Sequence, residues 1–303
     1  MKICISCGAK FTDSNWLCPA CFSRPGQVNG YLSFAPEEAQ SNEGFQPHHF
    51  AELADAEAGH FWFRSRNRLI IWALRHFFPE ARNFLEIGCG TGFVLSGVAE
   101  ANPQLEMSGS EIHSAGLNYA ANRVKHATLF QMDARDIPFE NEFDVIGAFD
   151  VLEHIEEDEK VLAQMFHAIS AGGGVILTVP QHRFLWSQQD EYACHVRRYE
   201  AQELHDKVEQ AGFRVESATS FVSLLLPLMF LSRLSKRKPV ENYDAAQEFR
   251  ISGPANRVLE RVLDLERMMI RAGISFPAGG SRLMIARKPA GAPRVSGSYA
   301  DTI

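Results

Sequence analysis

Four cysteines near the N-terminus have the spacing of a metal site. Cys4 and Cys7 form one Cys-x2-Cys pair, Cys18 and Cys21 form a second, and ten residues separate the pairs. Each pair places two thiolates on one tight turn, and two facing turns supply the four sulfur ligands that suit tetrahedral Zn²⁺. The first residues are too polar for a secretory signal, which favours metal over disulfides. We expect a zinc ribbon over residues 1–25, with a vestigial or degenerate site, or redox or iron–sulfur chemistry, as the alternatives.

A glycine loop is the second feature that could do chemistry. Residues 84–95 read Phe-Leu-Glu-Ile-Gly-Cys-Gly-Thr-Gly-Phe-Val-Leu, which predicts a buried strand, a loop and the start of a helix. A loop with so few side chains lets backbone N–H groups at a helix N-terminus approach a ligand. Gly88, Gly90 and Gly92 follow Glu86 with the spacing Gly-x-Gly-x-Gly, which differs from the dinucleotide fingerprint Gly-x-Gly-x-x-Gly.

Two carboxylates lie after the next two expected strands. Glu111 ends the strand expected over 105–111, about 20 residues past the glycine loop, where a carboxylate can accept hydrogen bonds from both hydroxyls of a ribose. Asp133, followed by the small Ala134, comes after the strand expected over 127–132. A solvated acid at a strand end and an ordinary turn aspartate are the alternatives.

Alternating strands and helices are expected to position these residues. The expected strands are 84–88, 105–111, 127–132, 143–149, 174–179, 213–219 and 282–287, with helices between most of them. This alternation predicts an α/β fold, in which a doubly wound, mostly parallel sheet of seven strands has helices on both faces. Ligands of such sheets bind at the carboxyl ends of the strands.

These motifs resemble the class I S-adenosylmethionine-dependent methyltransferases. The family's first motif is Glu/Asp-x-Gly-x-Gly-x-Gly, and residues 143–155, Phe-Asp-Val-Ile-Gly-Ala-Phe-Asp-Val-Leu-Glu-His-Ile, are also typical of it. Segments 59–66, 190–199 and 274–288 are similar to a type 11/12-like small-molecule subgroup. The resemblance covers roughly residues 50–288 and leaves out the cysteine module. It implies a Rossmann-like methyltransferase sheet and S-adenosyl-L-methionine as the cofactor.

The resemblance also implies which residues hold the cofactor. Asp133 would accept a hydrogen bond from the adenine amino group, and Ala134 would leave room for the ring. Asp150 and its neighbours would lie beside the methionine end, and Arg66 is a candidate for the cofactor's carboxylate. The full set expected to bind the cofactor is Glu86, Gly88, Cys89, Gly90, Gly92, Glu111, Ile112, Asp133, Ala134, Asp150, Val151 and Arg66.

Histidines are the candidate catalytic residues. Methyl transfer from a sulfonium is an in-line displacement, in which the protein mainly aligns the reactants and excludes water. A general base is needed only where the acceptor must lose a proton, and neutral imidazole can take it. His195 is the first candidate and His154 the second, with Asp190 as an assisting group. Arg197 and Arg198 follow His195 and could hold an anionic substrate or form structural ion pairs.

The segment from about 221 to 279 is expected to be a helical cap inserted before the last strand. Its apolar run 221–231 precedes Arg233, Lys236, Arg237 and Lys238, so a membrane-surface element or a groove for a lipid-linked acceptor is the alternative. We expect a linker over 26–47, the methyltransferase domain over 48–290 and a flexible tail over 291–303.

Composition limits the function. The chain of 303 residues is 46% apolar, which is enough for a large core, and its net charge of −7 argues against a nucleic-acid partner. No apolar run is long enough to span a bilayer, so we expect a cytoplasmic protein with at most peripheral membrane contact. The sequence predicts a methyltransferase that acts on a small molecule or on a glycan or lipid precursor. A zinc-ribbon nucleic-acid methyltransferase and a non-catalytic binding scaffold are the alternatives, and the oligomeric state is not predicted.

Overall fold

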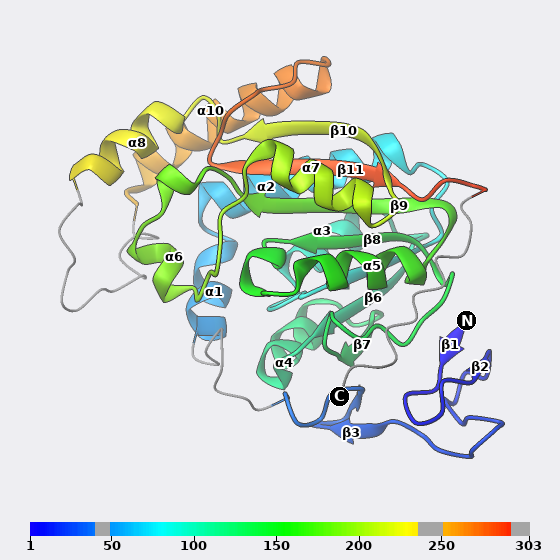
Figure 1. The fold of residues 1–303 in the computed structure, drawn as a ribbon. Coiled ribbons are helices and arrows are strands. Elements are labelled where there is room, and N and C mark those ends of the chain that lie inside the picture. The colour runs from blue at the N-terminus through cyan, green and yellow to red at the C-terminus, as the bar shows by residue number, and fades with distance from the viewer. Residues whose placement is uncertain (40–48, 236–250, 292–303) are drawn as a thin grey trace.

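The computed structural model describes residues 1–39, 49–235 and 251–291 (Figure 1). Its centre is a sheet of nine strands, which are β3 (Gly26–Val28), β4 (Tyr31–Ser33), β5 (Asn83–Ile87), β6 (Glu106–Glu111), β7 (Thr128–Gln131), β8 (Phe143–Phe149), β9 (Ile169–Pro180), β10 (Arg214–Phe221) and β11 (Ser281–Arg287). Their order across the sheet is β10-β11-β9-β8-β5-β6-β7-β4-β3.

The sheet is mostly parallel, as predicted. The pairs β4–β7, β7–β6, β6–β5, β5–β8 and β8–β9 are parallel, whereas β11 lies antiparallel between β9 and β10. The parallel strands therefore end at one edge, on the side where Figure 1 shows α1 (His49–Glu57), α6 (Gln188–Tyr192) and α8 (Leu226–Ser235).

Helices cover both faces of this sheet. The remaining helices are α2 (Phe61–Phe77), α3 (Phe93–Ala101), α4 (Ser114–Arg123), α5 (Asp158–Ala168), α7 (Ala201–Gln210) and α10 (Gly253–Arg271), with short 3₁₀ turns at η1 (Leu152–His154) and η2 (Arg183–Leu185). Residues 49–77 form two helices, α1 and α2, because the chain turns at residues 58–60.

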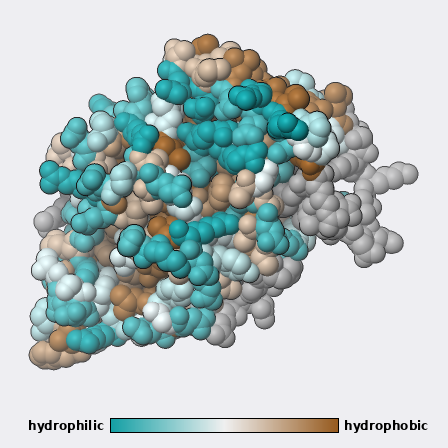
Figure 2. Space-filling view, turned by 180° about the vertical axis from the view of Figure 1, so that it is seen from behind, coloured by the Kyte–Doolittle hydropathy of each residue, from teal (hydrophilic) through white to brown (hydrophobic). Residues whose placement is uncertain are grey.

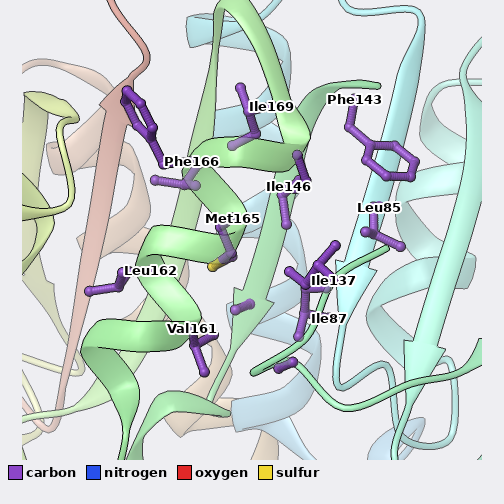
Figure 3. Close-up of a cluster of buried hydrophobic side chains, with 14 of the residues drawn as sticks. Leu85, Ile87, Ile137, Phe143, Ile146, Val161, Leu162, Met165, Phe166 and Ile169 are labelled. Carbon is purple, nitrogen blue, oxygen red and sulfur yellow. The ribbon is translucent and has the colours of Figure 1, made fainter. Parts of the chain in front are cut away.

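Two hydrophobic clusters lie on the two faces of the sheet. Successive side chains of a strand point to opposite faces, so Phe84 lies in one cluster and Leu85 in the other. On the face drawn in Figure 3, α5 contributes Val161, Leu162, Met165 and Phe166, the spacing of an apolar helix stripe. This packing fixes the strand ends that carry the candidate site.

The segment after the N-terminal module is part of the sheet. The prediction of a linker over 26–47 is wrong for residues 26–33. These residues form the β3–β4 hairpin, which covers the edge of β7 and raises the strand count from the expected seven to nine. The hairpin turns at Asn29-Gly30, where both residues have positive φ, 53° and 86°. Asn-Gly is a strong hairpin signal, and an unpaired edge strand gains from being covered.

The cysteine-bearing part packs against the same edge. Its two short strands, β1 (Lys2–Ile3) and β2 (Lys10–Phe11), pair with each other. The Trp16 ring is 5% exposed and its centroid lies 4.6 Å from that of Phe34 and 5.4 Å from that of Phe139. The backbone N–H of Ile3 donates to the carbonyl of Pro138 at 2.9 Å. The module therefore shares one hydrophobic core with the main domain.

The expected cap consists of α8 and α10, and residues 236–250 between them lie outside the described part of the chain. Glu260 of α10 accepts hydrogen bonds from Arg64 (Nε, 3.0 Å) and Arg68 (2.7 Å), which holds α10 on α2. Leu225 is buried, but Leu228 and Leu231 are 55% and 62% exposed. The cap therefore buries only part of its apolar surface.

Apolar side chains remain visible on the outside of this cap. Figure 2 shows them along the upper edge of the molecule, where α8 and α10 lie. Among the described residues, no helix combines the length and the hydropathy that a membrane span requires. Lys236, Arg237 and Lys238, on which the membrane-surface alternative depends, belong to the residues that the structure does not describe.

Candidate functional site

A cavity of about 1030 Å³ lies at the carboxyl ends of the parallel strands. The loops after β5, β6, β7 and β8 line one side of it, and α1, α2, α8 and the segment 193–198 complete the wall. The predicted cofactor-binding residues all line this cavity except Gly92, which is the N-cap of α3. The two predicted catalytic residues, His195 and His154, line it as well.

The glycine loop has a backbone conformation that side chains would disturb. Gly88, Gly90 and Gly92 have φ values of 63°, 50° and 75°. A Cβ on Gly92 would lie 2.7 Å from the Cα of Ala120, so this glycine lets α3 approach α4. A Cβ on Gly90 would meet only the ring of Phe50, at 3.8 Å. The loop is therefore tightly packed at Gly92, where it meets α4, and has open space at Gly90, which lines the cavity.

Glu111 is held against this loop by backbone donors. Its carboxylate accepts hydrogen bonds from the N–H of Gly90 at 3.0 Å and from the N–H of His113 at 3.1 Å. Burial raises the pKa of Glu111, and these backbone hydrogen bonds oppose that rise. A carboxylate has about four lone-pair positions, so Glu111 can still accept from a diol in the cavity.

A charged group lies where the resemblance places the methionine end of the cofactor. Arg66 forms an ion pair with Asp150, and its guanidinium lies 4.5 Å from the centroid of the Trp62 ring. Asp150 has a φ of 58°, a strained conformation that is common at functional sites. Glu86 is 3% exposed, and its Oε2 atom has no hydrogen-bond partner among the described residues. Burial raises the pKa of Glu86 well above its usual range.

Asp133 has a partner that the sequence did not reveal. Its carboxylate accepts hydrogen bonds from the Nε of Arg135, at 2.9 Å for the nearer oxygen, and from the backbone N–H of Arg135 at 2.8 Å. Met132 and Ala134 beside it are buried. Any further hydrogen bond to Asp133 is therefore shared with this arginine.

A second part of the cavity wall contains His195, which a buried carboxylate orients. Asp190 is fully buried and lies 2.9 Å from His195 Nδ1, while Arg198 Nε donates to it at 2.7 Å. Burial disfavours the charge on Asp190, but the His195 hydrogen bond and the Arg198 charge lower the pKa of Asp190 to about 2. His195 therefore has its Nδ1 occupied and its Nε2 available to the cavity.

His154 lies beside His195. The two ring centroids are 4.7 Å apart, and the rings are nearly perpendicular. Burial, together with the neighbouring His195, lowers the pKa of His154 to about 3. His154 is thus neutral at physiological pH.

The two arginines after His195 have structural partners. Arg198 holds Asp190, and Arg197 pairs with Asp158 at 2.8 Å and with Glu156 at 3.0 Å. Of the two roles that the sequence left open, the geometry favours structural ion pairs.

Sequence reasoning missed two acidic residues that line the cavity. Glu57 of α1 accepts a hydrogen bond from Thr91 Oγ1 at 2.6 Å and pairs with Arg123, which fixes α1 to the glycine loop. Glu153 lies on η1 with no exposed surface. It belongs to the Leu-Glu-His string quoted above, but the sequence does not show that its side chain is buried.

The four N-terminal cysteines converge as predicted. All four Sγ atoms lie within 4.8 Å of one another, and none of these cysteines forms a disulfide. Two sulfur pairs, Cys4–Cys21 and Cys7–Cys18, are each 3.6 Å apart. Sulfurs bound at about 2.3 Å in a tetrahedron lie roughly 3.8 Å apart. The arrangement therefore has the dimensions of a four-thiolate metal site.

Comparison with known proteins identifies the family to which the chain is similar. A family model described as "Methyltransferase domain" matches residues 54–218, more than half of the chain. A probable S-adenosylmethionine-dependent methyltransferase of Mycolicibacterium smegmatis is 26% identical over 162 residues, 52% of this chain. Ajmaline N-methyltransferase of Rauvolfia serpentina is 27% identical over 193 residues, 60% of this chain. The matched segments span 60% of the length of each relative.

A solved structure supports the fold. The [4+2]-cyclase SpnF superposes with a TM-score of 0.52 at 19% identity, over 76% of this chain and 83% of that one. This similarity confirms the Rossmann-like α/β architecture and carries no argument about activity.

Proposed function

The chain belongs to the methyltransferase-domain family, and on that premise we propose that it is an S-adenosylmethionine-dependent methyltransferase. The observation that carries the proposal is the pairing of the open glycine loop with Glu111 at the carboxyl edge of the sheet. When bound, S-adenosylmethionine supplies an electrophilic methyl group on a sulfonium sulfur. The residues of the cavity bind it, orient the acceptor and exclude water.

The cavity residues fit this cofactor. Glu111 is placed to accept from the ribose hydroxyls, and the buried Glu86 Oε2, which lacks a donor, suits the cofactor's ammonium group. Asp150, Arg66 and Val151 would lie at the methionine end. We propose Cys89, Ile112, Asp133 and Ala134 for the adenosine part. Gly88 and Gly90 would supply the close backbone approach, and Gly92 would support it by packing the loop against α4.

We propose that His195 and His154 act on the methyl acceptor. Both line the cavity, and Asp190 fixes the orientation of His195. Leu225, Leu228 and Met229 of the cap contribute an apolar wall. This mixture suits a small molecule, or a glycan or lipid precursor, with both apolar and polar parts, and ajmaline N-methyltransferase is by its name a small-molecule enzyme.

The experiment that tests the proposal is calorimetry with S-adenosylmethionine and its demethylated product. We expect micromolar binding, about 7–8 kcal/mol. Glu111→Ala should weaken it by about 1.5–3 kcal/mol, because hydrogen bonds to a charged group are lost. Glu106→Ala is the matched control, since Glu106 is exposed at the opposite end of the same strand. Preference for a nicotinamide dinucleotide would refute the assignment.

The acceptor can be searched for with labelled cofactor and fractionated cell extract. Label in a small molecule supports the proposal, whereas label in nucleic acid would favour the nucleic-acid methyltransferase. Cofactor binding without any methylated product in the extract would favour the binding scaffold.

We also propose that Cys4, Cys7, Cys18 and Cys21 hold one Zn²⁺. The sulfur separations support it, and the packing of Trp16 against the main domain supports a structural role. Elemental analysis of protein purified without added metal should give one zinc per chain. Cys7→Ser should lower that value, and Cys194→Ser, outside the cluster, should leave it unchanged. Zinc that survives replacement of all four cysteines would contradict this site.

A further inference from the structure

Glu153 is a buried acid that methyl transfer, as proposed above, does not use. It has no exposed surface, it lines the cavity, and neither of its carboxylate oxygens accepts a hydrogen bond from another described residue. Burial raises the pKa of Glu153 well above its usual range. Arg66 and Arg198 oppose this rise through their charge, but they donate to Asp150 and Asp190 instead. A buried carboxylate in this state is costly unless a cation or a proton compensates it.

Two imidazoles converge on the same carboxylate. His195 Nε2 lies 3.9 Å from Glu153 Oε1, and one ligand atom each from Glu153, His154 and His195 fall within 4.8 Å of one another. Ligands around a transition metal at about 2.1 Å lie roughly 3–4 Å apart, so the widest separation in the cluster needs to contract by up to about 1–2 Å.

The surroundings hold these side chains in a ligating orientation. Asp190 engages His195 Nδ1 at 2.9 Å, which leaves Nε2 for a metal, and such carboxylate–histidine pairs orient metal ligands in many proteins. The backbone N–H of Val196 donates to the Glu153 carbonyl at 2.8 Å, which ties the His195 segment to η1. Backbone hydrogen bonds with Ala193 and Cys194 act on the His154 ring.

We propose that Glu153, His154 and His195 bind one divalent transition-metal ion at the acceptor end of the cavity. Two imidazoles and one carboxylate suit ions such as Mn²⁺ or Fe²⁺, and the open side towards the cavity leaves coordination positions for a substrate. This inference rests on the proposed methyl transfer and specifies its acceptor class, a molecule with a hydroxyl oxygen.

The metal would activate such an oxygen without a protein base. The bound hydroxyl releases its proton to solvent at a lower pH, because the cation stabilises the oxyanion. The oxygen then uses its electron pair to bond the methyl carbon, and the pair of the broken carbon–sulfur bond stays on the sulfur. His195 is a ligand in this scheme, and the buried Glu153 supplies the negative charge that the ion needs.

The test is a titration of the zinc-loaded full chain with Mn²⁺, followed by electron paramagnetic resonance of the free ion. Mn²⁺ avoids the thiolate site, because it prefers oxygen and nitrogen ligands. We expect one Mn²⁺ per chain. Glu153→Gln should weaken Mn²⁺ binding at least tenfold, and so should His195→Gln. The His195 side chain is partly exposed, so His195→Gln is the second test if the substitution of the buried Glu153 prevents folding.

Glu200→Gln is the matched control, because it alters the similar His182–Glu200 pair, 3.3 Å apart and away from the cavity lining. It should leave Mn²⁺ binding unchanged. Calorimetry with S-adenosylmethionine on the same samples separates the two proposals. Cofactor binding without a Mn²⁺ site that depends on Glu153 and His195 would overturn the metal site and leave the methyltransferase proposal intact. Loss of cofactor binding alone would refute the methyltransferase proposal while the Mn²⁺ count still decides the metal site.

Discussion

The two ends of the cavity are built in different ways. At the glycine-loop end, backbone N–H groups of Gly90 and His113 hold Glu111, and the conformation of three glycines shapes the surface. At the acceptor end, side chains hold one another, with Asp190 fixing His195 opposite the buried Glu153. The first end depends on backbone conformation and the second on paired charges. Cofactor binding and turnover should therefore respond to different substitutions.

The largest expected effect separates the two ends directly. His195→Gln should lower methyl transfer by about 10²–10⁴-fold, the usual contribution of a group that assists proton loss, and should leave cofactor affinity unchanged. Labelled transfer to an extract fraction and calorimetry measure the two quantities. His205→Gln on α7, outside the cavity lining, is the histidine control. A parallel fall in cofactor affinity would show that the two ends are not separable.

The next effect concerns the backbone of the glycine-loop end. Gly92→Ala should destabilise the fold by about 2–5 kcal/mol, from about 1–2 for a left-handed alanine and about 1–3 for overpacking. The added Cβ meets the Ala120 backbone at 2.7 Å. Gly172→Ala is the control, because Gly172 has a φ of 82° but open space around its Cβ, so only the first cost applies. Equal losses in denaturant unfolding would contradict the close-approach argument.

The smallest effect is a pH dependence at the acceptor end. The pKa of Asp190 is about 2, against 3.8 for an unperturbed aspartate. The ionised Asp190 therefore stabilises the folded state fully at pH values above about 4. This contribution, about 2 kcal/mol, is lost as the pH falls from about 4 to 2. Unfolding curves at several pH values should show it in the wild type, and Asp190→Asn should lack it. An identical pH dependence in both proteins would refute the assignment.

Local patterns predicted much of the main domain. All seven expected strands are present, because strand and helix periodicity is recorded in neighbouring residues. The glycine loop and Glu111 also lie where predicted, since a strand end and the following turn specify them locally. The assignment of the individual site residues to the cofactor stays a prediction that the experiments above test.

The misses share one cause, which is pairing over long distances in the sequence. Residues 26–33 looked like a linker, although Asn29-Gly30 is a hairpin signal, because the partner strand β7 begins about a hundred residues later. Arg197 pairs with Asp158, 39 positions away in the sequence, and the sequence could not name that partner. The partners of a side chain are the groups packed around it in space, and the spacing of residues along the chain does not reveal which groups those are.

The sequence by itself determined the family, the parallel α/β sheet and the four-cysteine cluster, because each depends on residues close together in the chain. Only the tertiary structure decided that the cysteine module packs through Trp16 onto the sheet edge and that Glu153 is buried beside His195, 42 positions away. Burial and local charge are sums over all neighbours in space. The chemistry proposed for the acceptor end therefore depends on the tertiary structure, whereas the glycine loop could be predicted from the sequence alone.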